Sequence, residues 1–201
     1  LIPRFYDATE GTVSVDGVNV KDYSQKELRN KIGYVSQKAT LFTGTIESNV
    51  AYGDNGQKNA SETDIKKALD IAQASEFVDS LEDGSKAYVA QGGSNFSGGQ
   101  KQRMSIARAI ARKPEILIFD DSFSALDYKT DRVLREALAK SCKDSTRIIV
   151  AQRIGTIRDA DRIIVLEDGK IAGMGRHEEL MRDCEVYRQI ALSQLSKEEL
   201  A

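Results

Sequence analysis

Hydrophobic and polar positions repeat with two periods along this chain, and each period predicts a different kind of element. Residues 12–20, TVSVDGVNV, alternate on both sides of Asp16-Gly17, a pair common in tight turns, and predict an antiparallel hairpin. Residues 32–37, IGYVSQ, predict a short strand that ends at Gln37. One or two helical turns are predicted next, within GTIESNVAYG.

A helical period begins at Ser61, where SETD is a capping signal. Apolar residues then recur three and four positions apart, at Ile65, Ala68, Leu69 and Ala72. A second short helix is predicted within SEFVDSL, and the glycine-rich stretch QGGSNFSGG predicts a loop. Residues from about 55 to 95 therefore predict a small helical insert.

A long helix is predicted from Gly98 to Arg112, before Lys113-Pro114. Its predicted buried side carries Met104, Ala107, Ile110 and Ala111, and its predicted polar side carries Lys101, Arg108 and Arg112. Strands and helices then alternate, with strands in EILIFD, TRIIVAQ, DRIIVLE and KIAGMG. This alternation predicts an α/β fold with a mainly parallel sheet and crossover helices, and the hairpin adds an antiparallel β piece at the N-terminal end.

Two adjacent carboxylates follow one of these strands, in EILIFDDSFSALD. An uninterrupted apolar run is typical of a strand that is buried on both faces. Ligands of open α/β sheets bind at the carboxyl ends of such strands. Asp120 and Asp121 are therefore candidate active-site residues.

Composition limits the other kinds of site. The 201 residues are 40% hydrophobic and 30% charged, as in a soluble globular domain, and a net charge of -2 argues against nucleic-acid binding through bulk positive charge. Cys142, Cys184 and the single histidine, His177, have no metal-ligand spacing around them, so a zinc site or a disulfide scaffold is not expected. No apolar run approaches the length of a membrane span, so any membrane role is expected to come through a partner.

The stretch FSGGQKQR, residues 96–103, has the features of an anion site. Ser97 can cap the following helix, and Gly98 and Gly99 let backbone N–H groups approach a ligand. A helix N-terminus of this kind suits a γ-phosphate. The alternative is a plain capped helix after a flexible loop.

These motifs, in this order, resemble the ATP-binding-cassette (ABC) family of transport ATPases over essentially the whole chain. FSGGQ resembles its signature motif, ILIFDD its Walker B strand, SALD its D-loop, and Gln37 its Q-loop glutamine. LFTGTIESNVAYG and QGGSNFSGGQKQR resemble the exporter branch, and GRHEEL resembles the family's usual ending. The resemblance implies a P-loop NTPase core, with a helical and signature subdomain at about residues 40–112. It also implies ATP and Mg²⁺ as ligands, bound through Ser97, Gly98, Gly99, Gln100, Gln37 and Asp127 for the nucleotide and through Asp120 and Gln37 for the metal.

One motif of the family is missing from these residues. The Walker A loop, G-x-x-x-x-G-K-[ST], wraps the phosphates with backbone amides and a lysine, and Gly169-Lys170 does not fit it. In the family it precedes the segment that resembles LIPRFYD, so a chain truncated at its N-terminus is expected. Such a piece alone is expected to bind ATP weakly or not at all.

Two departures from the family concern the hydrolytic site. Asp121 stands where a glutamate usually orients or deprotonates the attacking water, and its side chain is one methylene shorter. Gln152 stands where a switch histidine contacts the γ-phosphate, and it cannot gain a proton near neutral pH. Together they resemble the slow half of a heterodimeric exporter, whose intact signature serves the partner's site. The alternative is that Asp121 is a working base in a slightly shifted site.

The resemblance also implies partners. A second nucleotide-binding domain is expected to close head to tail with this one. Residues 40–42 are expected near the coupling helices of a transmembrane domain, at the cytoplasmic face of the cell membrane; the alternative is that their apolar side chains are buried inside the fold. Asp127 is expected to face the partner domain, or alternatively only to cap a helix. The competing functions are the catalytic ATPase of a homodimeric exporter, a non-transport ABC protein and a non-hydrolysing regulatory module.

Overall fold

The computed structural model describes residues 1–53 and 60–198, with backbone only for 195–198. The chain divides into two compact units, Leu1–Val150 and Ala151–Ala201. In the first unit the elements are β1 (Ser14–Val15), β2 (Val18–Asn19), α1 (Gln25–Asn30), β3 (Ile32–Val35), β4 (Gly44–Thr45), α2 (Ile46–Val50), α3 (Glu62–Ile71), α4 (Ser75–Asp79), η1 (Gly84–Lys86), β5 (Tyr88–Val89), η2 (Gln91–Gly93), α5 (Gly98–Ala111), β6 (Ile116–Asp120), α6 (Tyr128–Ser141) and β7 (Thr146–Val150).

The predicted hairpin is present as β1 and β2, which pair antiparallel with Val15 opposite Val18. Asp16 and Gly17 both have positive φ, at 52° and 77°, as a tight two-residue hairpin turn requires. The prediction from the Asp-Gly pair is confirmed. The start of the predicted helical insert, at residues 55–59, lies outside the described residues.

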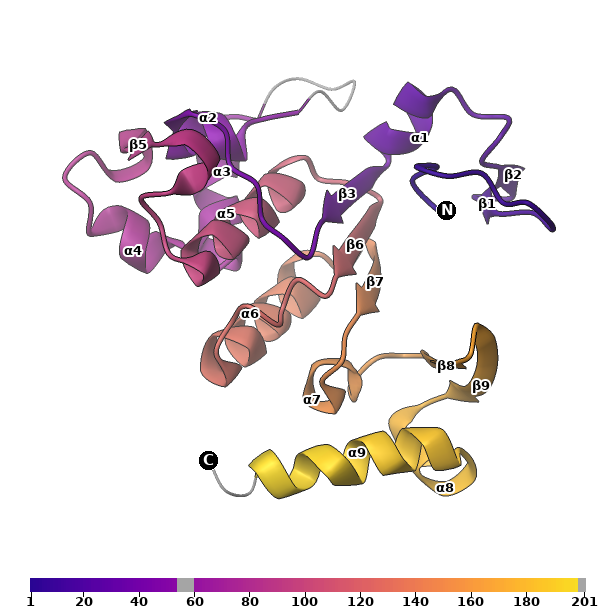
Figure 1. Cartoon of the computed structure of the whole chain (residues 1–201). Helices are drawn as coiled ribbons and strands as arrows, with labels where there is room; N and C mark the ends of the chain where they lie inside the picture. The colour runs from indigo at the N-terminus through magenta and orange to yellow at the C-terminus, as the bar shows by residue number, and fades with distance from the viewer. Residues whose placement is uncertain (54–59, 199–201) are drawn as a thin grey trace. The chain divides into compact units, whose positions relative to one another are not determined.

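The predicted parallel sheet is also confirmed, with β6 between β3 and β7. In Figure 1 the three arrows point the same way, so their carboxyl ends lie at one edge. Leu117 and Phe119 of β6 belong to the larger of the unit's two cores, whereas Ile118 belongs to the smaller one. Burial on both faces is the reason for the uninterrupted apolar run. The strand β3 ends at Val35, two residues before the predicted end at Gln37.

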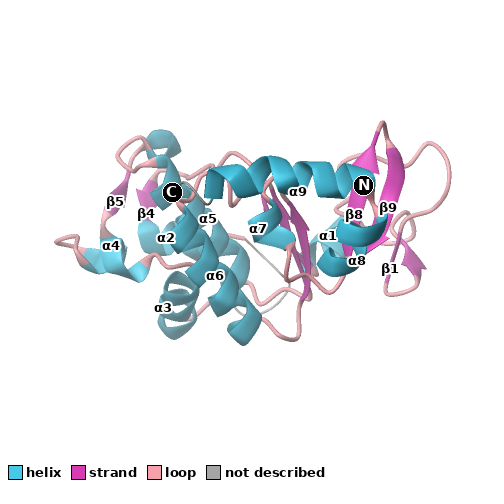
Figure 2. Cartoon of the chain, turned by 90° about the horizontal axis from the view of Figure 1, so that it is seen from below, coloured by secondary structure: helices cyan, strands magenta, loops and turns pink. Residues whose placement is uncertain are grey.

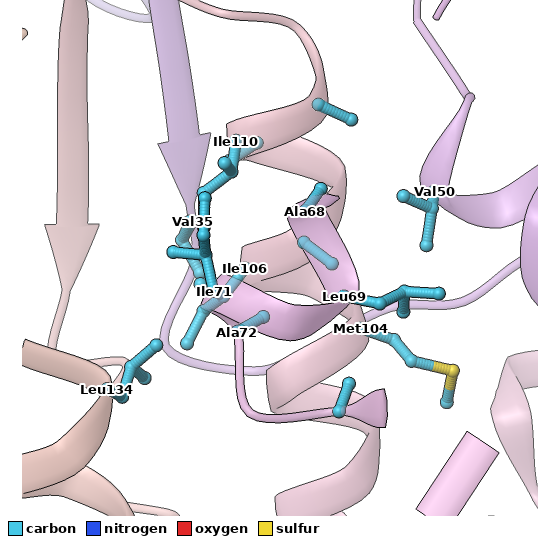
Figure 3. Packing of buried hydrophobic residues seen from close by; sticks show 14 of the residues in the cluster. Val35, Val50, Ala68, Leu69, Ile71, Ala72, Met104, Ile106, Ile110 and Leu134 are labelled. Carbon is cyan, nitrogen blue, oxygen red and sulfur yellow. The ribbon is translucent and has the colours of Figure 1, made fainter. Parts of the chain in front are cut away.

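The larger core lies among the sheet and the helices α2, α3, α5 and α6. Figure 3 shows Leu69 of α3, and Ala72 just after that helix, in this core together with Met104 of α5 and Val35 of β3. Ser61 caps α3 through the predicted capping box with Asp64. The predicted capping of this helix at Ser61 is therefore confirmed.

The side of α5 that was predicted to be polar is not simply a solvent face, because α2 packs against it. Arg108 donates from Nε to the Asn49 carbonyl oxygen at 2.8 Å and from Nη1 to the Thr40 carbonyl oxygen at 2.9 Å. Residues on several sides of α5, including Gln102 and Ser105, are also buried. The helix α5 is therefore packed by other elements on several sides, whereas its amphipathic pattern predicted one buried side only.

The second unit contains α7 (Ile154–Ile157), β8 (Ile163–Glu167), β9 (Lys170–Gly175), α8 (His177–Asp183) and α9 (Glu185–Glu198). The strand β8 was grouped with the parallel strands by sequence, but its pairing partner in the described residues is β9, antiparallel to it (Figure 2). His177 lies at the start of α8, and its Nδ1 is 2.8 Å from Tyr187 Oη. Among the helices of the described residues, none is both long and apolar enough to cross a membrane.

Candidate functional site

Asp120 is the last residue of β6, and its carboxylate is held from the neighbouring strand. Tyr34 on β3 donates from Oη to Asp120 Oδ2 at 2.7 Å. Phe5 meets the tyrosine ring edge to face, with centroids 5.3 Å apart. Burial and the bond to Asp120 raise the pKa of Tyr34 to about 12, so the phenol remains a donor through the physiological range.

Asp121 adopts a left-handed backbone conformation, with φ at 44°. Its N–H donates to the Val150 carbonyl oxygen at 2.9 Å, and its carbonyl oxygen accepts from Ser124 Oγ at 2.7 Å. Gln37 donates from Nε2 to Asp121 Oδ2 at 3.1 Å. Aspartate tolerates this conformation better than most residues, and such backbone strain is concentrated at functional sites.

The two carboxylates and the Gln37 amide form an oxygen-rich set at the end of the sheet. Within the described residues there is no group of three or more His, Cys, Asp or Glu side chains that could cage a metal. Mg²⁺ suits this arrangement, because it is usually bound by one or two carboxylates together with water and substrate phosphates. The structure thus places Gln37 beside Asp121, the neighbour of Asp120, and the metal role of Asp120 and Gln37 stays a prediction.

The second predicted cluster is the start of α5. Ser97 is the N-cap, with Oγ accepting from the Gln100 N–H at 3.3 Å, while Gln100 Oε1 accepts from the Ser97 N–H at 2.9 Å. A Cβ atom at Gly98 would meet nothing within 4 Å, and one at Gly99 would meet the Ala125 carbonyl oxygen at 3.5 Å. No acidic residue lies in the first turn. The turn therefore presents exposed backbone and the positive end of the helix dipole, which is suited to an anion.

Asp127 lies two residues after Ala125, whose carbonyl oxygen is close to Gly99. Its carboxylate accepts from the Thr130 N–H at 2.9 Å and from Thr130 Oγ1 at 2.7 Å, so it caps α6. Both bonds lower the pKa of Asp127, and the bond from the Thr130 backbone N–H has the larger effect. The capping role is therefore observed, and a role toward a partner domain stays a prediction.

Gln152 lies in the second unit, two residues after β7. Its carbonyl oxygen accepts from Gln194 Nε2 at 2.7 Å, and its side chain is exposed. The chain divides at Val150, so the predicted approach of Gln152 to the Asp121 site stays a prediction.

Two connections of this site were not predicted from sequence. Gln102, which is 1% exposed on α5, donates from Nε2 to the Ser36 carbonyl oxygen at 3.1 Å, next to Gln37. Tyr34 is the other. A polar residue within the buried turns of a helix is a signal for the first contact, but it does not identify the acceptor.

The segment after Gln37 is fixed by a buried polar centre. Asn49 is 1% exposed and donates from Nδ2 to the carbonyl oxygens of Phe42 and Thr45, at 2.7 and 3.0 Å. The Phe42 ring lies 4.5 Å from that of Tyr52, and the guanidinium of Arg108 stacks over both. Leu41 is buried, whereas Phe42 and Tyr52 are 44% and 55% exposed. The exposed rings of Phe42 and Tyr52 are thus held in place by the Asn49 hydrogen bonds and by Arg108.

Comparisons with known proteins agree on one kind of relative. The family described as ABC transporter matches residues 1–124. Over 194 residues the chain is 46% identical to an uncharacterized ABC transporter ATP-binding protein of Mycobacterium bovis, a match that covers 96% of this chain and 33% of that protein. ABC transporter B family member 21 of Arabidopsis thaliana is 46% identical over 191 residues, which are 94% of this chain and 14% of that protein.

Among solved structures, the structure of a bacterial Atm1-family ABC exporter with ATP bound matches with a TM-score of 0.91 and 36% identity. The match covers 96% of this chain and 34% of that one. The chain therefore spans about a third or less of the length of these relatives.

Proposed function

The chain belongs to the ABC transporter family, and we propose that it is the nucleotide-binding domain of an exporter, which binds ATP with Mg²⁺ at the cytoplasmic face of the cell membrane. ATP binding and hydrolysis there drive the export of a substrate. The observation that carries the proposal is the pairing of an acid-free, glycine-lined helix start at Ser97 with the carboxylates at the end of β6.

Asp120 and Gln37 would hold Mg²⁺, with Asp120 contributing through water. The ion would neutralise charge on the phosphates. Gln37 also orients Asp121, because its amide donates to that carboxylate. In this arrangement Asp121 accepts a proton from, or aligns, the attacking water.

The domain's own site is proposed to be slow. The Asp121 carboxylate stops one methylene short of where a glutamate would reach, and a misplacement of about 1 Å can cost on the order of 100-fold in rate. Gln152 can donate a hydrogen bond to phosphate but cannot act as a proton relay. These two residues support an asymmetric pair of sites, as in a heterodimer.

The partner is proposed to be a second nucleotide-binding domain that closes head to tail with this one. Ser97, Gly98, Gly99 and Gln100 would then contact the ATP held by the partner, and Asp127 would face the same interface. The open space around Gly98 supports this, because no atom of the described chain requires a glycine there.

The transmembrane domain is proposed to dock its coupling helices near residues 40–42. The exposed Phe42 and Tyr52 rings support this role, because large exposed aromatics on a rigid base are suited to an interface. Arg108 ties this surface to α5 and hence to the start of that helix. Closure of the two nucleotide-binding domains around ATP at the start of α5 would thus be transmitted through α5 and Arg108 to the transmembrane domain.

A second candidate is the catalytic ATPase domain of a homodimeric exporter, and the backbone of Asp121 favours it. At a φ of 44° aspartate is better tolerated than glutamate, so the shorter residue could be a working base in a shifted site.

The test is turnover at each ATP site of the full transporter, assembled with its partner. We expect Asp121→Glu with Gln152→His to raise turnover at this site by about tenfold or more, because a full-length base and a proton relay each restore catalysis. Asp121→Asn is the matched control, since it keeps the shape and removes the charge.

The outcomes separate the two candidates. If Asp121→Asn abolishes turnover and the double variant does not raise it, Asp121 is a competent base and the homodimeric alternative holds. If neither site hydrolyses ATP in any variant, the domain is a regulatory module and the proposed function fails.

A further inference from the structure

Tyr34 touches the carboxylate that the proposed function assigns to the metal, although it lies within a strand and in none of the motifs. Its hydroxyl donates to Asp120 Oδ2 at 2.7 Å. A short bond from a hydroxyl to a carboxylate is a strong one. The contact joins residues that are 86 positions apart in the chain.

The position of this hydroxyl is fixed by packing. Tyr34 pairs with Ile118, two residues before Asp120, in the register of β3 and β6. Its ring packs against the smaller core and lies edge to face with the Phe5 ring. The ring cannot swing away without losing these contacts, so the hydroxyl holds one orientation of the carboxylate.

Gln37, three residues further along the chain, holds Asp121 in a similar way. Each carboxylate of the pair thus has one oxygen engaged by a residue from β3 or its continuation. For Asp120, the oxygen that Tyr34 does not contact is Oδ1.

We propose that Tyr34 is a positioning residue for the metal: it holds Asp120 Oδ2, so that the other carboxylate oxygen would be available to Mg²⁺ or its water. The inference rests on the proposed function. Partners that orient metal-binding side chains in this way typically change metal affinity when they are removed.

The experiment uses Mn²⁺ as a paramagnetic probe and the full transporter with ATP. Tyr34→Phe keeps the ring and its packing and removes only the hydroxyl. We expect Mn²⁺ to bind at this site about tenfold more weakly, the lower end of the usual effect of such partners. The affinity for ATP without metal is expected to stay unchanged, whereas the melting temperature should fall slightly, because the lost hydrogen bond contributes modestly to stability.

Tyr23→Phe is the matched control. Tyr23 also packs against the smaller core, and its hydroxyl donates to the Val15 carbonyl oxygen at 3.2 Å, away from the carboxylates. It should leave Mn²⁺ affinity unchanged. If both phenylalanine variants weaken Mn²⁺ binding equally, the effect belongs to the core and the inference is wrong.

Asp120→Asn separates this inference from the proposed function. If Asp120→Asn weakens Mn²⁺ binding and Tyr34→Phe leaves it unchanged or strengthens it, only the role of Tyr34 is refuted. If Asp120→Asn has no effect, the metal role of Asp120 is refuted and the role of Tyr34 with it. Weaker binding in both, with no further loss in the double variant, is the expected result.

Discussion

The helices α3 and α5 begin with the same local structure and carry different charges in it. In each, a serine N-cap accepts from the backbone N–H three residues later, and the side chain at that position accepts from the serine N–H. In α3 that side chain is Asp64, and Glu62 precedes it, whereas in α5 it is the neutral Gln100 after two glycines. Acidic residues stabilise a helix N-terminus, so α5 has given up part of this stabilisation.

The same contrast holds for the other capped helices. Among helices of the described residues that have a side-chain N-cap, α5 is the one without an acid in its cap or first turn. A helix start that is kept free of negative charge and of Cβ atoms is suited to receive an anion. We therefore propose that α3 begins with a structural cap and that α5 begins with a binding cap, one suited to hold an anion.

The largest expected effect comes from giving α5 the cap of α3. Gln100→Glu keeps the capping box and adds a negative charge near the proposed phosphate. At a separation of about 5 Å and an effective dielectric constant of about 20, this repulsion is worth about 3 kcal/mol, or roughly 100-fold in ATP turnover at the partner's site.

The helix itself should gain about 0.5 kcal/mol from the added charge. Thermal unfolding of the chain and turnover of the assembled transporter measure the two effects. Turnover at the wild-type level in Gln100→Glu would mean that no phosphate approaches this helix.

The contrast between the caps was predictable from sequence, but its surroundings were not. SETD and FSGGQ are local signals, and so is the Asp-Gly turn between β1 and β2, because each depends on residues within one turn of the chain. Such features of the fold were predicted correctly. The alternation of strands and helices also predicted the parallel order of the sheet.

Contacts between distant segments could not be predicted in the same way. The bond from Gln102 to Ser36 spans 66 residues, and its partner depends on how α5 lies across β3. The left-handed backbone of Asp121 depends on the turn in which Ser124 bonds back to it. Such features follow from packing, on which the residue pattern of one segment carries little information.

A smaller effect is expected from Gly98→Ala. The added methyl group meets no atom of the described chain, and alanine is favoured over glycine within a helix by about 1 kcal/mol, so stability should rise or stay equal. The methyl would nevertheless displace an anion at this position by a fraction of 1 Å, and we expect turnover at the partner's site to fall about tenfold.

Differential scanning calorimetry and single-turnover hydrolysis measure these two effects. Ser105→Ala, further along the same helix, is the control, because it should leave turnover unchanged. A loss of turnover that is matched by a loss of stability in Gly98→Ala would contradict the binding cap.

The smallest effect is expected at the structural cap. A hydrogen-bonded ion pair with Lys113 and then the hydroxyl of Ser61 lower the pKa of Asp64 to about 2. An acid whose pKa is lower in the folded chain stabilises it above the usual pKa, near 4, and this contribution is lost as the pH falls toward 2.

Asp64→Asn keeps the shape of the cap and removes this dependence. We therefore expect its melting temperature to be slightly below wild type at neutral pH, and the difference to shrink as the pH falls from about 4 to about 2. ATP turnover at neutral pH should not change, because α3 offers no binding cap. A gap that stays constant across this pH range would show that the charge of Asp64 adds nothing to the stability of α3.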